Sequence, residues 1–262
     1  MALLRLDHTP ETVKLCIPLY LILPDPGRMA EIPLQERKVL YLLHGLSDDG
    51  SVWVRYSSIE NTARDYGLVV VMPSVGRSFY ADQPDGQHYY SYLAEELPAY
   101  LQAVFGLSPA RENTLIAGLS MGGYGAMKMA FNFPERYAAA ASFSGMLSLE
   151  FLRRYPDDPR NKMFEYVFGE LASLHGSQHD PLTWLRQATS NPSALPRLYA
   201  SCGRQDDLYP LNQLFWGTCQ QLGIPVETYE EDAMHDWHFW EKEIKHFLKL
   251  VLGEPPERKE RK

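Results

Sequence analysis

Short, continuous runs of apolar residues recur along the chain, and turn-forming residues bound most of them. Continuous rather than alternating hydrophobicity is typical of strands that are buried on both faces of a parallel sheet. The first β-rich run, residues 13–24, is bounded by prolines and therefore suits a strand near a sheet edge. Further strands are predicted at residues 38–45, 68–75, 112–120, 138–145, 197–203 and 226–231.

Helix-like stretches lie between these strands, at residues 57–67, 92–106, 121–137 and 211–223. Alternation of strand and helix predicts an α/β protein whose central sheet is mostly parallel, with helices on both faces and an antiparallel N-terminal portion. Residues 146–196 show no clear strand, so we interpret them as a short, cap-like insertion at one end of the sheet. We expect a single domain over residues 1–253 and, because proline and charge dominate there, a disordered tail over residues 254–262.

Charge and composition narrow the classes of partner. The formal net charge is −8 at pH 7, which disfavours nucleic acid and anionic membranes, because both require clustered lysine and arginine. No segment approaches the ~18 apolar residues of a membrane span, and the N-terminus lacks the apolar core of a secretion signal. We therefore expect a cytoplasmic protein, and the sequence leaves open whether it forms a homo-oligomer.

The cysteines Cys16, Cys202 and Cys219 have no CxxC spacing. Neither a disulfide framework nor a zinc site is indicated, and each is expected to be a small buried side chain. We predict no metal and no cofactor.

Residues 118–122 read Gly-Leu-Ser-Met-Gly and match the G-x-S-x-G pattern. This pattern places a nucleophilic serine on a strained turn between a strand and a helix, and its glycines leave room for that turn. A five-residue match is weak evidence alone, but here a strand-like run precedes it and helix-like residues follow. We therefore predict an α/β-hydrolase fold with Ser120 as nucleophile, rather than a glycine-rich turn with a bystander serine.

An oxyanion hole requires two backbone N–H groups that are fixed before the reaction. His44 and Gly45 end an early predicted strand and are similar to the His-Gly element of lipases and esterases. We assign the two amides to Leu46 and Met121. His44 itself could be mistaken for a catalytic base, but a histidine that ends a buried strand is more often structural.

The general base of this fold follows the nucleophile along the chain, on a loop after a strand. His175 and His179 fall in the insertion, and His246 lies in an amphipathic helix. His235 directly follows the last predicted strand and is our candidate, with His238 as the alternative. A metal site built on these two histidines is disfavoured, because no third ligand cluster stands out.

The acid that supports the imidazole should follow the strand at residues 197–203. Asp206 and Asp207 both do so. One of them could instead start a turn or cap the next helix, and the residues alone do not choose between the two.

Taken together, the strings YLLHGLSDDGSVW, GLSMGGYGAMKMAF, CGRQDDLY and MHDWHFW resemble the esterase D family of α/β-hydrolases, most nearly its bacterial tributyrin esterases. Related members include S-formylglutathione hydrolases, feruloyl and acetyl-xylan esterases and mycolyltransferases. The resemblance runs from about Lys38 to the final helix. It implies that Asp206, three residues after Gly203, is the acid, and that His235 is the base. Met234 stands where the family usually has glycine.

The motifs and the resemblance predict a serine carboxylesterase that hydrolyses short-chain acyl esters of small molecules through an acyl-enzyme intermediate. Alternatives on the same fold are an S-formylglutathione-type thioesterase, an acetyl or feruloyl carbohydrate esterase and an acyltransferase. A non-catalytic binding protein is disfavoured by the intact set of catalytic residue types. Aromatic side chains near the predicted loops could wall an acyl pocket or simply pack in the core: Trp53, Phe79, Tyr80, Tyr124 and Trp237.

Overall fold

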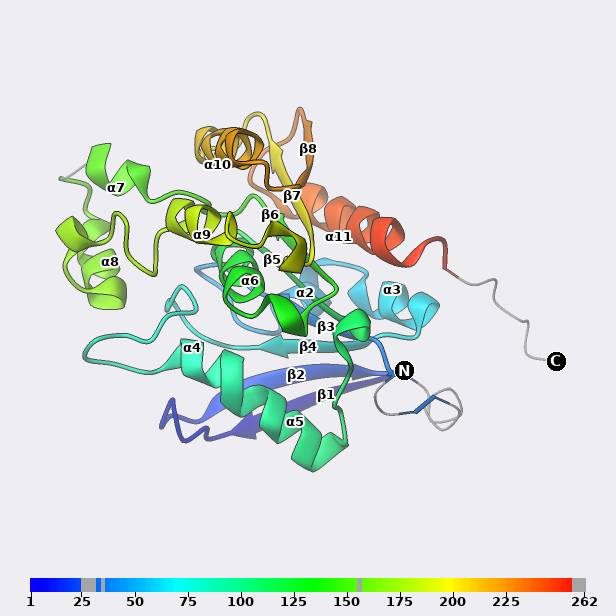
Figure 1. Ribbon diagram of the computed structural model, residues 1–262. Helices are drawn as coiled ribbons and strands as arrows, with labels where there is room; N and C mark the ends of the chain where they lie inside the picture. The colour runs from blue at the N-terminus through cyan, green and yellow to red at the C-terminus, as the bar shows by residue number, and fades with distance from the viewer. Residues whose placement is uncertain (25–31, 34–35, 155–156, 256–262) are drawn as a thin grey trace.

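The computed structural model describes residues 1–24, 32–33, 36–154 and 157–255 of the chain. In this part, eight strands form one sheet in the order β1-β2-β4-β3-β5-β6-β7-β8. β1 and β2 run antiparallel to their neighbours, and all later pairs are parallel (Figure 1). The mostly parallel sheet with antiparallel N-terminal strands is therefore confirmed. The strands are β1 (Ala2–His8), β2 (Ile17–Leu23), β3 (Val39–Leu43), β4 (Val69–Pro73), β5 (Thr114–Leu119), β6 (Ala139–Phe143), β7 (Arg197–Gly203) and β8 (Glu227–Glu231).

The edge strand β1 was not among the predicted strands. It pairs with β2 along its whole length, and its side chains are exposed or only partly buried. A strand with one neighbour and a solvated face contains both polar and apolar residues. Because β1 includes charged residues such as Arg5 and Asp7, it lacks the continuous apolar run by which the other strands were predicted.

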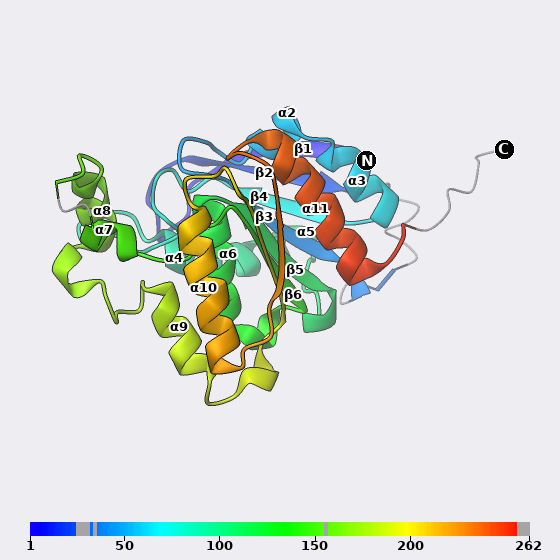
Figure 2. The ribbon, with the colours of Figure 1, turned by 90° about the horizontal axis from the view of Figure 1, so that it is seen from above.

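Two separate apolar cores lie on the two faces of the sheet. Alternate residues of β3 divide between them, so that Leu40 and Leu42 face one core while Tyr41 and Leu43 face the other. Helices cover both faces, as expected (Figure 2). One face packs against α2 (Val52–Tyr56), α3 (Ile59–Tyr66) and α11 (Trp237–Leu252), and the other against α5 (Leu97–Phe105), α6 (Met121–Asn132), α9 (Pro181–Ala188) and α10 (Tyr209–Leu222).

The described residues between β6 and β7 form helices and no strand, and no clear strand was predicted there from the sequence. Helix α9 packs against α6 and α10, whereas α7 (Glu150–Arg154) and α8 (Asn161–Phe168) project beyond them (Figure 1). The remaining helical segments are short: α4 (Tyr89–Ser91), η2 (Tyr92–Glu96), η3 (Arg111–Asn113), η4 (Pro134–Arg136), η5 (Leu171–Ser173) and η6 (Pro192–Ala194).

Three further expectations concern the surface and the chain end. Cys202 and Cys219 are buried, but Cys16 is exposed, so the expected burial of all three was wrong for Cys16. No helix of the described residues combines the length and apolarity that crossing a membrane requires. The predicted disordered tail falls largely on residues 256–262, which lie outside the described residues.

The parallel strands all end at the same edge of the sheet. The loops that follow β3, β5, β7 and β8 carry His44, Ser120, Asp206 and His235 respectively. Crevices at this carboxyl edge are where open α/β sheets bind ligands.

Candidate active site

Ser120 forms a strained turn between β5 and α6. Its backbone has φ 53° and ψ −117°, a conformation that non-glycine residues adopt at a cost and only when the surroundings impose it. A Cβ atom at Gly118 would lie 2.4 Å from the carbonyl of Gly122, and one at Gly122 would lie 2.4 Å from the oxygen of Leu43. The two glycines are therefore required by close backbone contact, which explains the spacing of the motif.

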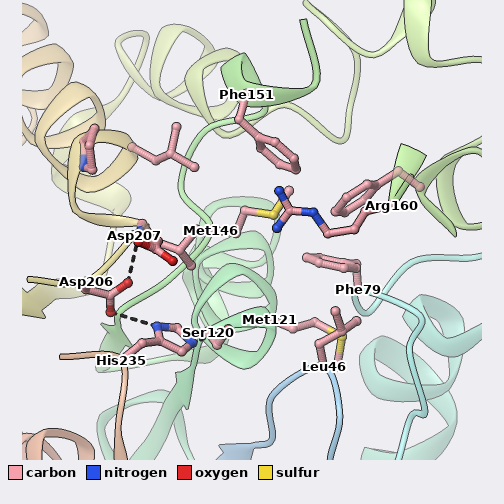
Figure 3. Close-up of a pocket in the computed structure, with 14 residues that line it drawn as sticks. Leu46, Phe79, Ser120, Met121, Met146, Phe151, Arg160, Asp206, Asp207 and His235 are labelled. Carbon is pink, nitrogen blue, oxygen red and sulfur yellow. Dashed lines mark hydrogen bonds and ion pairs between the residues drawn. The ribbon is translucent and has the colours of Figure 1, made fainter. Parts of the chain in front are cut away.

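The side chains of Ser120, His235 and Asp206 form a continuous hydrogen-bonded chain. Nε2 of His235 lies 3.1 Å from Oγ of Ser120, and Nδ1 of the same ring lies 2.7 Å from Oδ2 of Asp206 (Figure 3). The Asp206 side chain is fully buried, whereas that of His235 is 36% exposed. The alternative candidates, Asp207 and His238, are both exposed. Asp206 and His235 are the pair that meets beside the serine.

The environment of Asp206 keeps its carboxylate ionised. Burial raises the pKa of this group, but hydrogen bonds from His235, Ser144 and the backbone N–H of Leu208 outweigh burial, so the pKa lies below its ordinary value. The indole of Trp240 donates to Ser144 at 3.1 Å, and its ring also meets the edge of His235 at 4.8 Å between centroids. Asp206 and His235 are thus supported by two different neighbours that are hydrogen-bonded to each other.

The neutral ring of His44 orients the Gly45–Leu46 peptide. The backbone N–H of Val75 lies 3.0 Å from Nε2, and an N–H can only donate, so Nε2 is unprotonated and Nδ1 carries the hydrogen. Nδ1 then donates to the carbonyl of Gly45 at 2.7 Å. Complete burial lowers the pKa of His44 to about 4, which keeps the ring neutral. His44 therefore has the structural role that its position in the sequence suggested.

Leu46 and Met121 carry the two amides that the sequence assigned to an oxyanion hole. In a trans peptide the C=O and N–H point in opposite directions, so anchoring the Gly45 carbonyl on the imidazole turns the Leu46 N–H away from it. Met121 is the first residue of α6, where a backbone N–H has no acceptor within the helix, and no side chain caps this end. Both residues line the same cavity as Ser120.

This cavity has a volume of about 500 Å³ and opens at the carboxyl edge of the sheet. Figure 3 shows Phe79 and Phe151 on the side away from Asp206, with the Arg160 guanidinium between them. Its lining is mainly apolar: Leu46, Phe79, Ser120, Met121, Met146, Phe151, Arg160, Phe164, Asp206, Asp207, Leu208, Pro210, Leu211 and His235.

Most of the aromatic residues expected in the pocket do not line this cavity. Trp53, Tyr80 and Tyr124 are completely buried, and Trp237 packs edge-on against Trp53 at 5.1 Å. Of the two roles that the sequence left open for these side chains, their burial fits core packing, and of the five only Phe79 lines the cavity.

The insertion supplies cavity residues that sequence reasoning missed. Phe151 and Phe164 belong to α7 and α8, and Met146 and Arg160 lie in the adjoining loops. The apolar residues of this segment were its one available signal, but they gave no indication of which helix face would turn toward the serine.

The described residues offer no metal-binding site. Within the described residues, no three His, Cys, Asp or Glu side chains come together in a group that could hold an ion.

Comparison with known proteins decides the family. Residues 17–249 match the model of the family described as "Putative esterase". The chain belongs to this esterase family. It is 30% identical over 254 residues to an acetyl esterase of Caldicellulosiruptor saccharolyticus, covering 93% of this chain and 96% of that one. The expected esterase D-like membership is thereby confirmed.

Two solved structures from Staphylococcus aureus are similar over nearly the whole chain. FphF, a fluorophosphonate-binding serine hydrolase solved with bound substrate, is 32% identical with a TM-score of 0.87, covering 96% of this chain and 98% of that one. An S-formylglutathione hydrolase, FrmB, is 33% identical with a TM-score of 0.84 and the same coverage. The α/β-hydrolase fold is confirmed, and this esterase-family chain is a carboxylic ester hydrolase.

Proposed function

We propose that this esterase-family protein is a serine carboxylesterase that hydrolyses short-chain acyl esters through Ser120, His235 and Asp206. The observation that carries the proposal is the pair of contacts made by one imidazole, 3.1 Å to the serine hydroxyl and 2.7 Å to the buried carboxylate. Acyl transfer to serine requires a hydroxyl, here on a strained turn, a base within hydrogen-bond reach and an acid that orients the base.

In the first half-reaction, Nε2 of His235 takes the hydroxyl proton as Oγ of Ser120 attacks the ester carbonyl. Asp206 holds the ring so that Nδ1 keeps its hydrogen, and its negative charge stabilises the imidazolium that forms. The N–H groups of Leu46 and Met121 donate to the carbonyl oxygen as it becomes an oxyanion. The imidazolium then protonates the departing alcohol oxygen, and the C–O bond breaks to leave an acyl-serine.

In the second half-reaction, water occupies the place of the alcohol. His235 removes a proton from the water as it attacks the acyl-serine, and the same two amides stabilise the second oxyanion. The proton returns to Oγ of Ser120 as the ester bond breaks, so the carboxylic acid leaves and the enzyme is restored.

The preference for short acyl groups is supported by the walls of the cavity. Phe164 is almost fully buried and its ring centroid lies 5.3 Å from that of Phe79, so a long chain would have to displace packed side chains. The volume of about 500 Å³ must hold the alcohol portion as well as the acyl group. The similarity to an acetyl esterase agrees with this proposal.

The test is a series of p-nitrophenyl esters from acetyl to decanoyl, measured with wild type and Ser120→Ala. We expect kcat/KM to be greatest between acetyl and butyryl, and Ser120→Ala to lose both hydrolysis and labelling by a fluorophosphonate probe. Circular dichroism must show that the variant is folded. Activity that survives in folded Ser120→Ala would contradict the mechanism, and an optimum at octanoyl or longer would contradict only the chain-length preference.

A thioesterase of the S-formylglutathione type is a second candidate, favoured by the 33% identity to FrmB. The same serine, histidine and aspartate would act, with a thiol leaving in place of an alcohol. Paired oxygen esters and thioesters that share one acyl group distinguish the two, because a thioesterase should show the higher kcat/KM on the thioester after correction for the uncatalysed rates.

A further inference from the structure

Phe79 and Tyr80 adopt an unusual backbone conformation in the loop after β4. Their φ angles are 50° and 49°, so two consecutive non-glycine residues lie in the left-handed region. Such a conformation is costly, by about 1–3 kcal/mol per residue, and persists only where the surrounding structure imposes it. Both side chains are buried, at 3% and 0% exposure.

Several contacts hold Tyr80 in this strained turn. Its backbone N–H donates to Oγ of Ser78 at 3.1 Å, and its carbonyl accepts from Nζ of the buried Lys128 at 3.2 Å. The face of the ring lies against α6 where Gly125 leaves room, since a Cβ atom there would be 2.4 Å from the ring. Two hydrogen bonds thus hold the backbone of Tyr80, and close packing at Gly125 places its ring against α6.

The hydroxyl of the Tyr80 ring contacts the loop that follows β3. The Tyr80 hydroxyl donates to the carbonyl of His44 at 3.0 Å. The next carbonyl along the chain, that of Gly45, is held by the His44 ring at 2.7 Å, and its peptide unit carries the N–H of Leu46. Two consecutive peptides beside the serine are therefore anchored, the first by Tyr80 and the second by His44.

We infer that Tyr80 is a positioning residue, which through its hydroxyl fixes the His44–Leu46 backbone so that the Leu46 N–H meets the oxyanion. The inference rests on the proposed function, because the Leu46 N–H has a catalytic role only if the protein transfers acyl groups to Ser120. The neighbouring Phe79 lines the cavity, so one strained turn sets both a cavity wall and the oxyanion-binding backbone.

The chemistry of the hydroxyl suits this role. Complete burial raises the pKa of Tyr80 well above its ordinary value, so the group remains a neutral donor throughout the working range of an esterase. A buried hydroxyl requires a hydrogen-bond partner, and the partner of this one is the carbonyl that begins the oxyanion loop.

Tyr80→Phe removes this hydrogen bond and leaves the ring in place. Loss of one oxyanion donor costs about 10²–10³ in kcat, and a misplaced donor should cost less, so we expect kcat to fall by roughly 10-fold or more with KM little changed. Affinity for a boronic acid that mimics the tetrahedral intermediate should fall by the same factor as kcat/KM.

Tyr92→Phe is the matched control. Tyr92 is also fully buried, and its hydroxyl lies 2.9 Å from Nε2 of His8, beyond the residues that line the cavity. This variant should lose stability as Tyr80→Phe does but keep kcat and boronic acid affinity. Should Tyr80→Phe not fold, Ser78→Ala removes the acceptor of the Tyr80 amide instead and is expected to lower kcat with KM unchanged.

The possible results separate the inference from the proposal on which it rests. Wild-type kcat and boronic acid affinity in Tyr80→Phe, with Ser120→Ala inactive, would overturn the role of Tyr80 alone. Equal losses of kcat in Tyr80→Phe and Tyr92→Phe would also overturn it, because a general loss of stability would then explain both. Activity in folded Ser120→Ala would instead overturn the proposed function.

Discussion

The protonation state of His44 gives a quantitative prediction about stability. Burial lowers the pKa of this ring to about 4 in the folded protein, against an ordinary value of 6.5 in the unfolded chain. Between these two pH values the unfolded chain binds a proton that the folded protein does not, so the proton favours unfolding. Stability contributed by His44 is therefore lost as the pH falls from about 7 to about 4, and no further loss follows below that.

The magnitude follows from the difference between the two pKa values. A difference of about 2.5 units at 1.36 kcal/mol per unit corresponds to a loss of about 3 kcal/mol in the free energy of unfolding. Folding stabilities are commonly about 5–15 kcal/mol, so one residue would account for a large part of the acid sensitivity.

Urea unfolding of wild type and His44→Gln, at several pH values from 8 to 4, measures this contribution. At pH 8 the variant should be less stable by about 1–3 kcal/mol, because the buried Gly45 carbonyl loses its hydrogen bond from the His44 ring. The difference should shrink by about 3 kcal/mol as the pH falls to 4, since the variant has no imidazole to protonate. His238→Gln, which removes an exposed histidine, is the control. A difference between wild type and His44→Gln that stays constant to within about 1 kcal/mol would refute the buried, neutral imidazole.

Other variants probe the remaining parts of the site. Gly122→Ala should lose activity and about 1–3 kcal/mol of stability, because the new Cβ would lie 2.4 Å from a backbone oxygen of β3; kinetics and thermal melts check this. Asp206→Asn should lower kcat by about 10³- to 10⁴-fold, whereas Asp207→Asn, whose side chain does not contact His235, should lose far less. Lys128, whose pKa burial lowers to about 7, binds a proton more readily in the unfolded chain. From pH 7 to 10, wild type should therefore gain up to about 1.4 kcal/mol per pH unit relative to Lys128→Met in urea unfolding.

The sequence alone determined the parallel part of the sheet and the chain positions of the proposed catalytic residues. Buried parallel strands must be apolar on both faces, so they can be recognised in the sequence as continuous apolar runs. The glycines at 118 and 122 mark a turn that larger residues could not make. The order of strands then placed Ser120 and His235 at one edge of the sheet. Choosing Asp206 over Asp207 needed the family resemblance, since both residues follow the same strand.

Tertiary structure decided what lies around these residues. Whether an aromatic side chain lines a cavity or packs in the core depends on neighbours far away in the chain, which is why the sequence left both roles open for Trp53, Tyr80 and Tyr124. The Tyr80 hydroxyl meets His44 across 36 residues, and no local pattern encodes that contact. Local periodicity records which face of an element is apolar, but the partners of that face follow only from how the elements pack together.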